Sequence, residues 1–187
     1  MSVWQTVGAL WLVWVASWFV ASVWTNATDR RPKAGQEWGY RLVTFAGAIM
    51  MIARERPLAH FDLQPALAWS LVFAIFCGFA WAWWARIHLG RMWSSSVTKK
   101  AGHRIIDTGP YGIVRHPIYT GLILSLFATA MLEDQIVAFV GAATMTLGFW
   151  MKARLEERLL REELGWETYD AYRRRVPMLV PFGPKSA

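Results

Sequence analysis

Residues 109–121 read GPYGIVRHPIYTG and lead into an uncharged run that continues to residue 132. This run predicts a helix over residues 117–132, because a proline fits the first turn of a helix, where its missing N–H is not needed. His116 is expected at the N-terminal end of that helix, since the residue before a proline favours an extended backbone. Arg115, His116 and the helix N-terminus could together bind an anion, or they could anchor the helix at a membrane interface. The residue types alone leave both interpretations open.

The composition indicates a membrane protein. Of the 187 residues, 55% are hydrophobic, only 18% are charged, and 13 are tryptophan. Tryptophan gathers at both interfaces of a bilayer, whereas a soluble domain of this size rarely carries so much aromatic surface. The formal net charge of +7 comes with basic residues beside the apolar runs, which favours anionic lipid headgroups over nucleic acid as the partner. Because Cys77 is the single cysteine, a disulfide within the chain is excluded.

Five apolar runs predict membrane-spanning helices. They cover residues 3–24, 38–53, 63–85, 117–132 and 135–151. The second run is the weakest, because its uncharged core is short and it crosses a bilayer only if Arg41 extends its charge to the interface. Only two residues separate the last two runs, so these helices are expected to form an antiparallel hairpin. The predicted fold class is therefore all-α, a polytopic membrane protein with about five transmembrane helices.

A charged tail follows the last apolar run. Residues 152–164 are expected to extend the preceding helix beyond the membrane, Gly165 to end it, and residues 166–175 to form a short amphipathic helix. Lys152 and Glu156 are four residues apart and therefore share one helix face. Such a pattern usually means a solvated helix with ion pairs along it. A functional interpretation gains weight from location, because this segment is expected to leave the membrane beside the helix that begins at His116.

Counting lysine and arginine predicts the orientation. The segments after the first and third runs and the C-terminal tail are basic, whereas the N-terminus and the turn at residues 133–134 carry neither Lys nor Arg. Arg54 and Arg56, between the second and third runs, oppose this pattern mildly. The N-terminus is expected outside and the C-terminus in the cytoplasm, which places His116 and the charged tail on the same side.

Several common functional motifs are absent from the sequence. It contains neither a glycine-rich phosphate-binding loop nor a Gly-x-Ser-x-Gly nucleophile motif. The four histidines are not at the spacing of metal ligands. No metal is therefore expected.

An ordered set of motifs in the C-terminal half is specific enough to suggest a family. The motifs occupy residues 103–111, 115–121, 156–157, 164–172 and 175–177. Together they resemble the isoprenylcysteine carboxyl methyltransferase family and the related phospholipid N-methyltransferases, over residues 86–182. The resemblance implies one integral membrane methyltransferase domain over residues 1–187, in which the helices of residues 1–85 support a cofactor-binding catalytic half, residues 86–187. It also implies S-adenosylmethionine as the methyl donor, bound in a cytoplasmic pocket.

The resemblance carries site residues over by position. The implied cofactor contacts are His103, Arg104, Ile105, Ile106, Tyr111, His116, Pro117, Ile118, Tyr119 and Glu156. The family's substrate-contacting arginine lies four residues before the cofactor glutamate, where this chain has Lys152. Lysine keeps the charge but lacks the planar fork that grips a carboxylate, so Arg154 and Arg86 are alternative contacts for the substrate. A carboxylate acceptor needs no general base, whereas an amine would need one, with Glu157 or His116 as the candidate.

The activity implied by the resemblance is S-adenosylmethionine-dependent methylation of a lipophilic acceptor at the cytoplasmic membrane face. The acceptor is expected to be an isoprenylcysteine-type carboxylate or a similar lipid-like molecule that arrives from the bilayer. The expected location is a prokaryotic plasma membrane. Neither nucleic acid nor a metal is expected as a partner.

Two alternatives belong to other classes. The membrane sterol reductases resemble the same region and use NADPH, but the consecutive carboxylates Glu156 and Glu157 would repel a 2′-phosphate and suit a cationic sulfonium. A non-catalytic membrane scaffold would explain the tryptophans and the charged segments. It would not explain why His116, Tyr119 and Glu156 occur in the order of the methyltransferases.

Overall fold

The computed structural model describes residues 1–23, 28–30, 34–53, 63–90, 99–100 and 105–185. Within these residues the secondary structure is almost entirely helical, which confirms the predicted all-α class. The elements are α1 (Val3–Ser22), β1 (Thr28–Arg30), α2 (Ala34–Ile52), α3 (Pro65–Leu89), β2 (Lys99–Lys100), the 3₁₀ helix η2 (Gly109–Gly112), α4 (Pro117–Glu133), α5 (Ile136–Leu164) and α6 (Trp166–Arg175).

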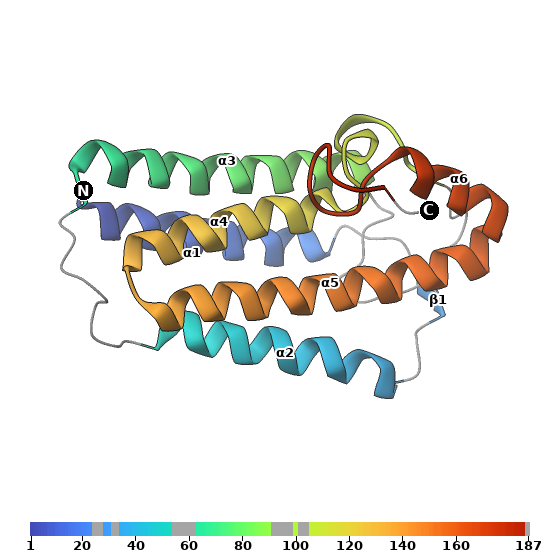
Figure 1. Ribbon diagram of the computed structural model, residues 1–187, viewed down its shortest axis with the longest axis horizontal. Coiled ribbons are helices and arrows are strands. Elements are labelled where there is room, and N and C mark those ends of the chain that lie inside the picture. Colours follow the sequence, from blue (N-terminus) through green and yellow to red (C-terminus); the bar gives the residue numbers. More distant parts are fainter. Residues whose placement is uncertain (24–27, 31–33, 54–62, 91–98, 101–104, 186–187) are drawn as a thin grey trace.

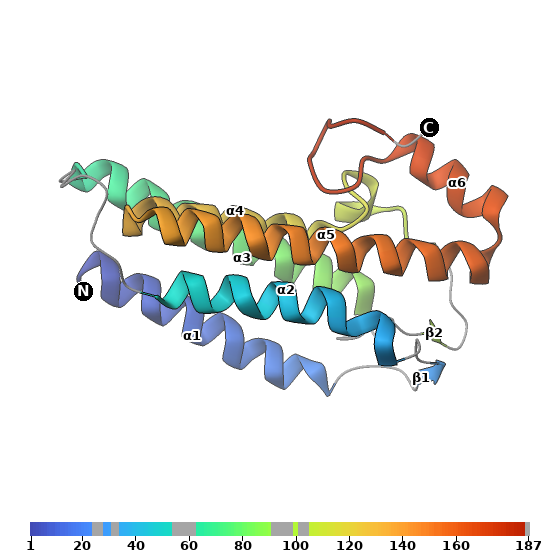
Figure 2. The same ribbon diagram turned by 60° about the horizontal axis from the view of Figure 1, so that its bottom comes forward.

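Helices α1 to α5 lie side by side with their long axes close to one direction (Figure 1). Helix α3 packs along α4 and α2 packs along α5, while α4 and α5 join in a hairpin and α1 lies against α3. The start of the chain lies at the same end of the bundle as this hairpin, and α6 lies at the opposite end (Figure 2). One end of the bundle therefore carries the N-terminus and the α4–α5 turn, and the other carries α6.

Small residues bring the paired helices into close approach. A Cβ atom added to Gly121 of α4 would collide with the carbonyl of Gly78 in α3, and one added to Gly78 would collide with Ser125 and the carbonyl of Gly121. Gly141 of α5 lies in the same way against Gly47 of α2. Close backbone approach is how helices associate inside a membrane, where burying apolar surface gives no advantage over lipid.

Three helices, α1, α3 and α5, are long and apolar enough to cross a membrane. Helix α4 is also apolar but has only 17 residues. Helix α2 carries the half-buried Glu37 and the exposed Arg41 in its first two turns, and these charges are the physical reason why it was the weakest of the five expected spans. The set of five predicted helices is present, with bounds that differ by a few residues.

The structure corrects the surroundings of Arg86. The third apolar run was expected to end at residue 85, but α3 continues to Leu89 and Arg86 is fully buried in its last turn. Its guanidinium donates to the carbonyls of Gly90 at 2.7 Å and Ala21 at 2.8 Å. Arg86 therefore holds the C-terminal end of α1 against α3.

A short antiparallel pair of strands, β1 and β2, was also not predicted. Thr28 pairs with Lys100 and Arg30 with Lys99. Two loops far apart in the sequence thus meet at the end of the bundle that carries α6 (Figure 2).

The tail follows the prediction closely. Helix α5 continues without a break from its apolar part into the charged residues 152–164, which lie beyond the apolar run. Gly165 ends the helix with φ of 89°, a backbone conformation that favours glycine, and α6 covers the predicted residues 166–175. Figure 2 shows α6 turning back towards the rest of the bundle.

Candidate active site

His116 lies at the junction of α4 with the charged part of α5. It is the N-cap residue of α4, and its imidazole is buried with 8% of the residue exposed. Nδ1 lies 3.5 Å from Glu156 Oε2, and Nε2 lies 3.2 Å from Glu157 Oε1. Both ring nitrogens therefore face a carboxylate.

Tyr119 lies one turn further along α4 and stacks against two other rings. Its ring stacks on His116 with centroids 5.6 Å apart and on Phe149 of α5 with centroids 5.4 Å apart. Its hydroxyl donates to Glu156 Oε1 at 2.8 Å. The predicted meeting of the His116 segment with the tail carboxylates is thus present in the structure.

Glu157 is the buried centre of a cluster of cations. It accepts a hydrogen bond of 2.7 Å from Arg115 Nε and lies 3.3 Å from Arg173 Nε of α6, in addition to its contact with His116. Burial alone would raise the pKa of this carboxyl, but the hydrogen bonds and charges of His116 and Arg115 lower it to about 2. A carboxylate with so low a pKa is a weak proton acceptor, which speaks against Glu157 as a general base.

The environment of His116 also disfavours proton abstraction. Burial alone would lower the pKa of the imidazole, but the hydrogen bonds to Glu156 and Glu157 outweigh burial and raise the pKa above 6.5. His116 is then increasingly protonated near neutral pH, with each N–H directed at one carboxylate. His116 thus links both carboxylates of α5 to the start of α4.

The N-terminal end of α4 is closed by the chain's own tail. The backbone N–H groups of Arg115 and His116 donate to the carbonyls of Pro177 and Met178, at 2.9 and 3.1 Å. The Thr120 hydroxyl donates to the carbonyl of Leu179 at 2.6 Å. The backbone N–H groups of Arg115 and His116, which precede the first turn of α4, are therefore already bonded within the protein.

The Arg115 side chain is likewise engaged inside the protein. Besides Glu157, it donates from Nη1 to the carbonyls of Arg173 at 3.1 Å and Val176 at 2.6 Å. The residue is 4% exposed. Arg115 therefore fastens α6 and the following segment to the start of α4.

The other residues predicted to contact the cofactor differ in burial and in their neighbours. Tyr111 is buried in η2, where its carbonyl accepts a bond of 2.7 Å from the Tyr172 hydroxyl. Ile105 packs against the tyrosines of α6, Ile106 is half-buried, and Pro117 and Ile118 form the first turn of α4. His103 and Arg104 lie outside the described residues.

Among the residues predicted to contact the substrate, Lys152 alone lies beside this constellation in the described structure. Its ammonium is 3.9 Å from Glu156 Oε1. Arg154 is exposed on another face of α5, with its guanidinium 5.4 Å from the ring centroid of Trp150. Arg86 is used in the contact between α1 and α3 described above.

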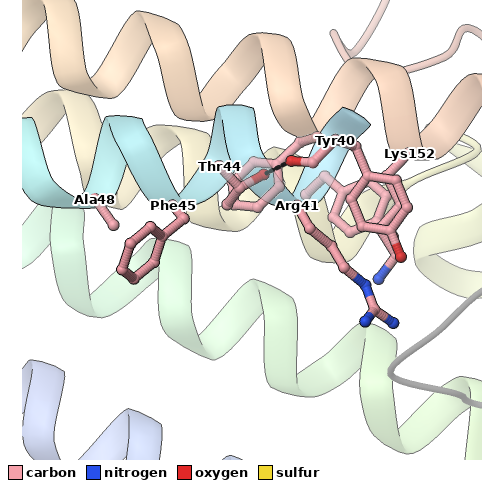
Figure 3. Close-up of a pocket in the computed structure, with 8 residues that line it drawn as sticks. Tyr40, Arg41, Thr44, Phe45, Ala48 and Lys152 are labelled. Atoms are coloured by element: carbon pink, nitrogen blue, oxygen red, sulfur yellow. Dashed lines mark hydrogen bonds between the residues drawn. The ribbon is translucent and has the colours of Figure 1, made fainter. Parts of the chain in front are cut away.

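A cavity of about 350 Å³ adjoins Lys152 between α2, α4 and α5. It is lined by Tyr40, Arg41, Thr44, Phe45, Ala48, Tyr119, Phe149 and Lys152 (Figure 3). Figure 3 shows Tyr40 and Lys152 together at one end of this row and Phe45 and Ala48 at the other. Apolar walls thus meet two cationic side chains, Arg41 and Lys152. The contribution of α2 was not predicted, because Tyr40-Arg41 before an apolar run reads as an ordinary interface anchor.

A second set of ion pairs fixes α6 on α5. Asp170 accepts from Arg161 at 2.8 Å and from Arg173 at 3.1 Å, and the Arg161 guanidinium lies 4.4 Å from the ring centroid of Trp166. Through Asp170 these contacts help to hold the Arg173 guanidinium where it faces Glu157. Among the described residues, no group of three or more His, Cys, Asp or Glu side chains is arranged to hold a metal ion.

Comparison with known proteins identifies the region around this site. The sequence pattern of the isoprenylcysteine carboxyl methyltransferase family matches residues 70–162, from α3 to the charged part of α5. Methanethiol S-methyltransferase 2 of Bradyrhizobium diazoefficiens is 44% identical over 71 residues, which are 38% of this chain and 26% of that protein.

Two eukaryotic proteins match over longer stretches. Protein-S-isoprenylcysteine O-methyltransferase B of Arabidopsis thaliana is 34% identical over 87 residues, 46% of this chain and 44% of that protein. The Protein-S-isoprenylcysteine O-methyltransferase of Schizosaccharomyces pombe is 30% identical over 106 residues, 54% of this chain and 43% of that protein. The chain thus spans less than half the length of each of these relatives.

Proposed function

Through residues 70–162 the chain belongs to the isoprenylcysteine carboxyl methyltransferase family of membrane methyltransferases, and we propose on this premise that it methylates a lipophilic acceptor with S-adenosylmethionine as the donor. We further propose that the reaction takes place at the cytoplasmic face of a prokaryotic plasma membrane, with the N-terminus outside and the C-terminus inside. In this proposal residues 1–85 support the site and residues 86–187 bind the cofactor, within one domain.

The observation that carries this proposal is the setting of Glu156. Its side chain keeps 22% of its surface exposed, while Tyr119 and His116 hold its two oxygens from α4. A fixed carboxylate beside aromatic rings suits a cationic group and repels a phosphate. The residues present therefore fit a sulfonium cofactor.

The chemistry then requires alignment more than proton transfer. S-adenosylmethionine, when bound, supplies an electrophilic methyl group on its sulfonium. The protein contributes by holding the acceptor in line and by keeping water away from the reacting atoms. The fixed helix ends around His116 and Glu157 give the rigidity that such alignment needs.

The charge states of the site favour an acceptor that arrives as an anion. The lowered pKa of Glu157 makes it a weak base, and the raised pKa of His116 favours its protonated form, so neither is well suited to remove a proton from an amine. A carboxylate, or a thiol in its thiolate form, can attack without such help. The named relatives include both an O-methyltransferase and an S-methyltransferase.

The cavity between α2, α4 and α5 supports a place for this acceptor. Its apolar walls suit a hydrocarbon part that enters from the bilayer, and Lys152 and Arg41 carry charges that complement one anionic group. Arg41 is paired with Glu37 at 2.6 Å and Lys152 lies 3.9 Å from Glu156 Oε1, but the Lys152 side chain is 15% exposed against 50% for Arg41, which makes Lys152 the stronger of the two candidates. Arg154 and Arg86, placed elsewhere by the structure, have no part in this proposal.

Calorimetric titration of the detergent-solubilised protein tests the proposed cofactor. S-adenosylmethionine is expected to bind, and Glu156→Gln is expected to weaken binding about tenfold, because a charge-assisted contact is lost. Glu162→Gln serves as the matched control, since Glu162 is exposed on the same helix. Binding of NADPH instead of the sulfonium compound would overturn the proposal and favour a reductase.

A further inference from the structure

The Lys152 ammonium lies between two tyrosine rings and a carboxylate. Its Nζ is 5.8 Å from the ring centroid of Tyr40 and 5.6 Å from that of Tyr119. Glu156 Oε1 lies 3.9 Å away. We call Tyr40, Tyr119 and Glu156 the cation site. Its members come from α2, α4 and α5, so it forms only when these three helices are packed together.

The walls of the cation site are fixed independently of Lys152. Tyr119 is stacked on His116 and Phe149 and bonded to Glu156, as described above. Tyr40 is 7% exposed and packs with Leu155. Lys152, in contrast, has a long flexible stem whose end can move while the walls stay in place. The site therefore keeps its shape when the cation within it changes.

Aromatic faces combined with one carboxylate bind ammonium and sulfonium ions by the same physics. A ring face attracts any cation within about 6 Å, and alkylated onium ions are favoured because they are weakly hydrated. Glu156 already faces the His116 imidazole, so two further cations in the same space repel each other. Lys152 and an added onium ion are therefore expected to exclude one another.

We propose that Lys152 is an intramolecular competitor for the cation site, so that a cofactor sulfonium binds there by displacing the lysine towards the adjoining cavity. This inference rests on the proposed function and extends it to the order of binding. Displaced Lys152 would face the anionic group of the acceptor, because the same side chain lines the cavity. Binding of the cationic methyl donor would thus place the Lys152 charge where the acceptor binds.

The same exchange would act in reverse after the methyl group has moved. Breaking the bond between the sulfonium sulfur and the methyl carbon leaves a neutral thioether, while the acceptor anion gains the methyl group and loses its charge. A neutral thioether no longer competes with Lys152 for Glu156. The lysine returns to the cation site, and the contact that held the acceptor is withdrawn.

The test compares a cationic and a neutral ligand on the full-length solubilised protein. Dissociation constants of S-adenosylmethionine and S-adenosylhomocysteine are measured by calorimetry for the wild type and for Lys152→Met. The variant is expected to bind the sulfonium about tenfold more tightly and the thioether within about twofold of the wild type. Arg158→Met, which removes an exposed positive charge from the same helix, is expected to change neither constant more than about twofold.

Two further variants address the walls. In the Lys152→Met background, Tyr40→Leu is expected to weaken sulfonium binding about fivefold, whereas Tyr40→Phe, which keeps the ring, is expected to retain it. The competition would be overturned if Lys152→Met changed the dissociation constants of both ligands equally, or if it weakened sulfonium binding. In either case, binding of S-adenosylmethionine to the wild type would still uphold the proposed function. Binding of neither ligand to any folded variant would overturn the proposed function, and this inference with it.

Discussion

The Tyr119 hydroxyl donates a hydrogen bond of 2.8 Å to Glu156 Oε1, and this bond joins α4 to α5 at the edge of the cavity. It sets the direction of the carboxylate on which the proposed cofactor depends. The stacking of the same ring on His116 and Phe149 means that removing the oxygen leaves the ring in place.

Tyr119→Phe is therefore expected to affect the orientation of the Glu156 carboxylate without affecting the packing of the ring at position 119. The lost hydrogen bond should cost about 1 kcal/mol of stability, while the ring contacts remain. Affinity for S-adenosylmethionine should fall about fivefold, because Glu156 gains freedom to rotate. Calorimetric titration measures the affinity, and a thermal unfolding curve of the same sample measures the stability. An unchanged affinity would show that Glu156 is oriented by His116 alone.

Glu157→Gln is expected to destabilise the protein strongly. The substitution leaves the buried Arg115 guanidinium without its charged partner, a change that typically costs about 3–5 kcal/mol. Thermal unfolding in detergent measures the loss. Glu162→Gln, at an exposed position of the same helix, should stay within about 0.5 kcal/mol of the wild type. A stable Glu157→Gln protein with selectively lowered turnover would instead restore Glu157 as a candidate general base.

The pKa of His116 predicts a pH dependence of stability. The pKa of His116 is raised in the folded protein. The stability that His116 contributes to the fold is therefore fully present below its unfolded-state pKa near 6.5, and it is lost as the pH rises through the folded-state pKa. The wild type is expected to lose part of its thermal stability on the alkaline side of pH 6.5. The measurement is the unfolding midpoint against pH, compared with His116→Gln. Parallel curves for the two proteins would contradict the prediction.

Gly121→Ala is expected to separate α3 from α4. The new methyl group would meet the Gly78 carbonyl and the backbone of Ala82, and such overpacking costs about 1–3 kcal/mol. Gly8→Ala is the matched control, because no described atom lies within 4 Å of an added Cβ there. Unfolding midpoints of both variants in one detergent give the comparison. Equal midpoints would show that the helix pair can relax without cost.

Local patterns in the sequence were sufficient for the elements and for part of the site. The range of α6, the helix end at Gly165 and the meeting of His116 with the tail carboxylates each follow from signals within about 20 residues or from the order of motifs. These features depend on side-chain types that are visible in the sequence. They were therefore accessible before any coordinates.

Other features depend on contacts that leave little trace in the sequence. Tyr40 reaches the site because α2 packs along α5, a long-range contact that no motif near Tyr40 indicates. The bonds from Arg115 and His116 to Pro177 and Met178 run between backbone atoms, which every residue type carries. Arg86 was misplaced because a helix that ends in a buried arginine looks, in sequence, like a helix followed by a polar loop.

The closing of α4 by the tail also has a consequence for biosynthesis. Thr120 is bonded to Leu179, which is added 59 residues later. All five long helices can enter the bilayer before that residue leaves the ribosome, yet the helix end that carries His116 lacks its backbone partners until then. Membrane insertion and completion of the site are thus separate events in time, and the second waits for residues 177–179.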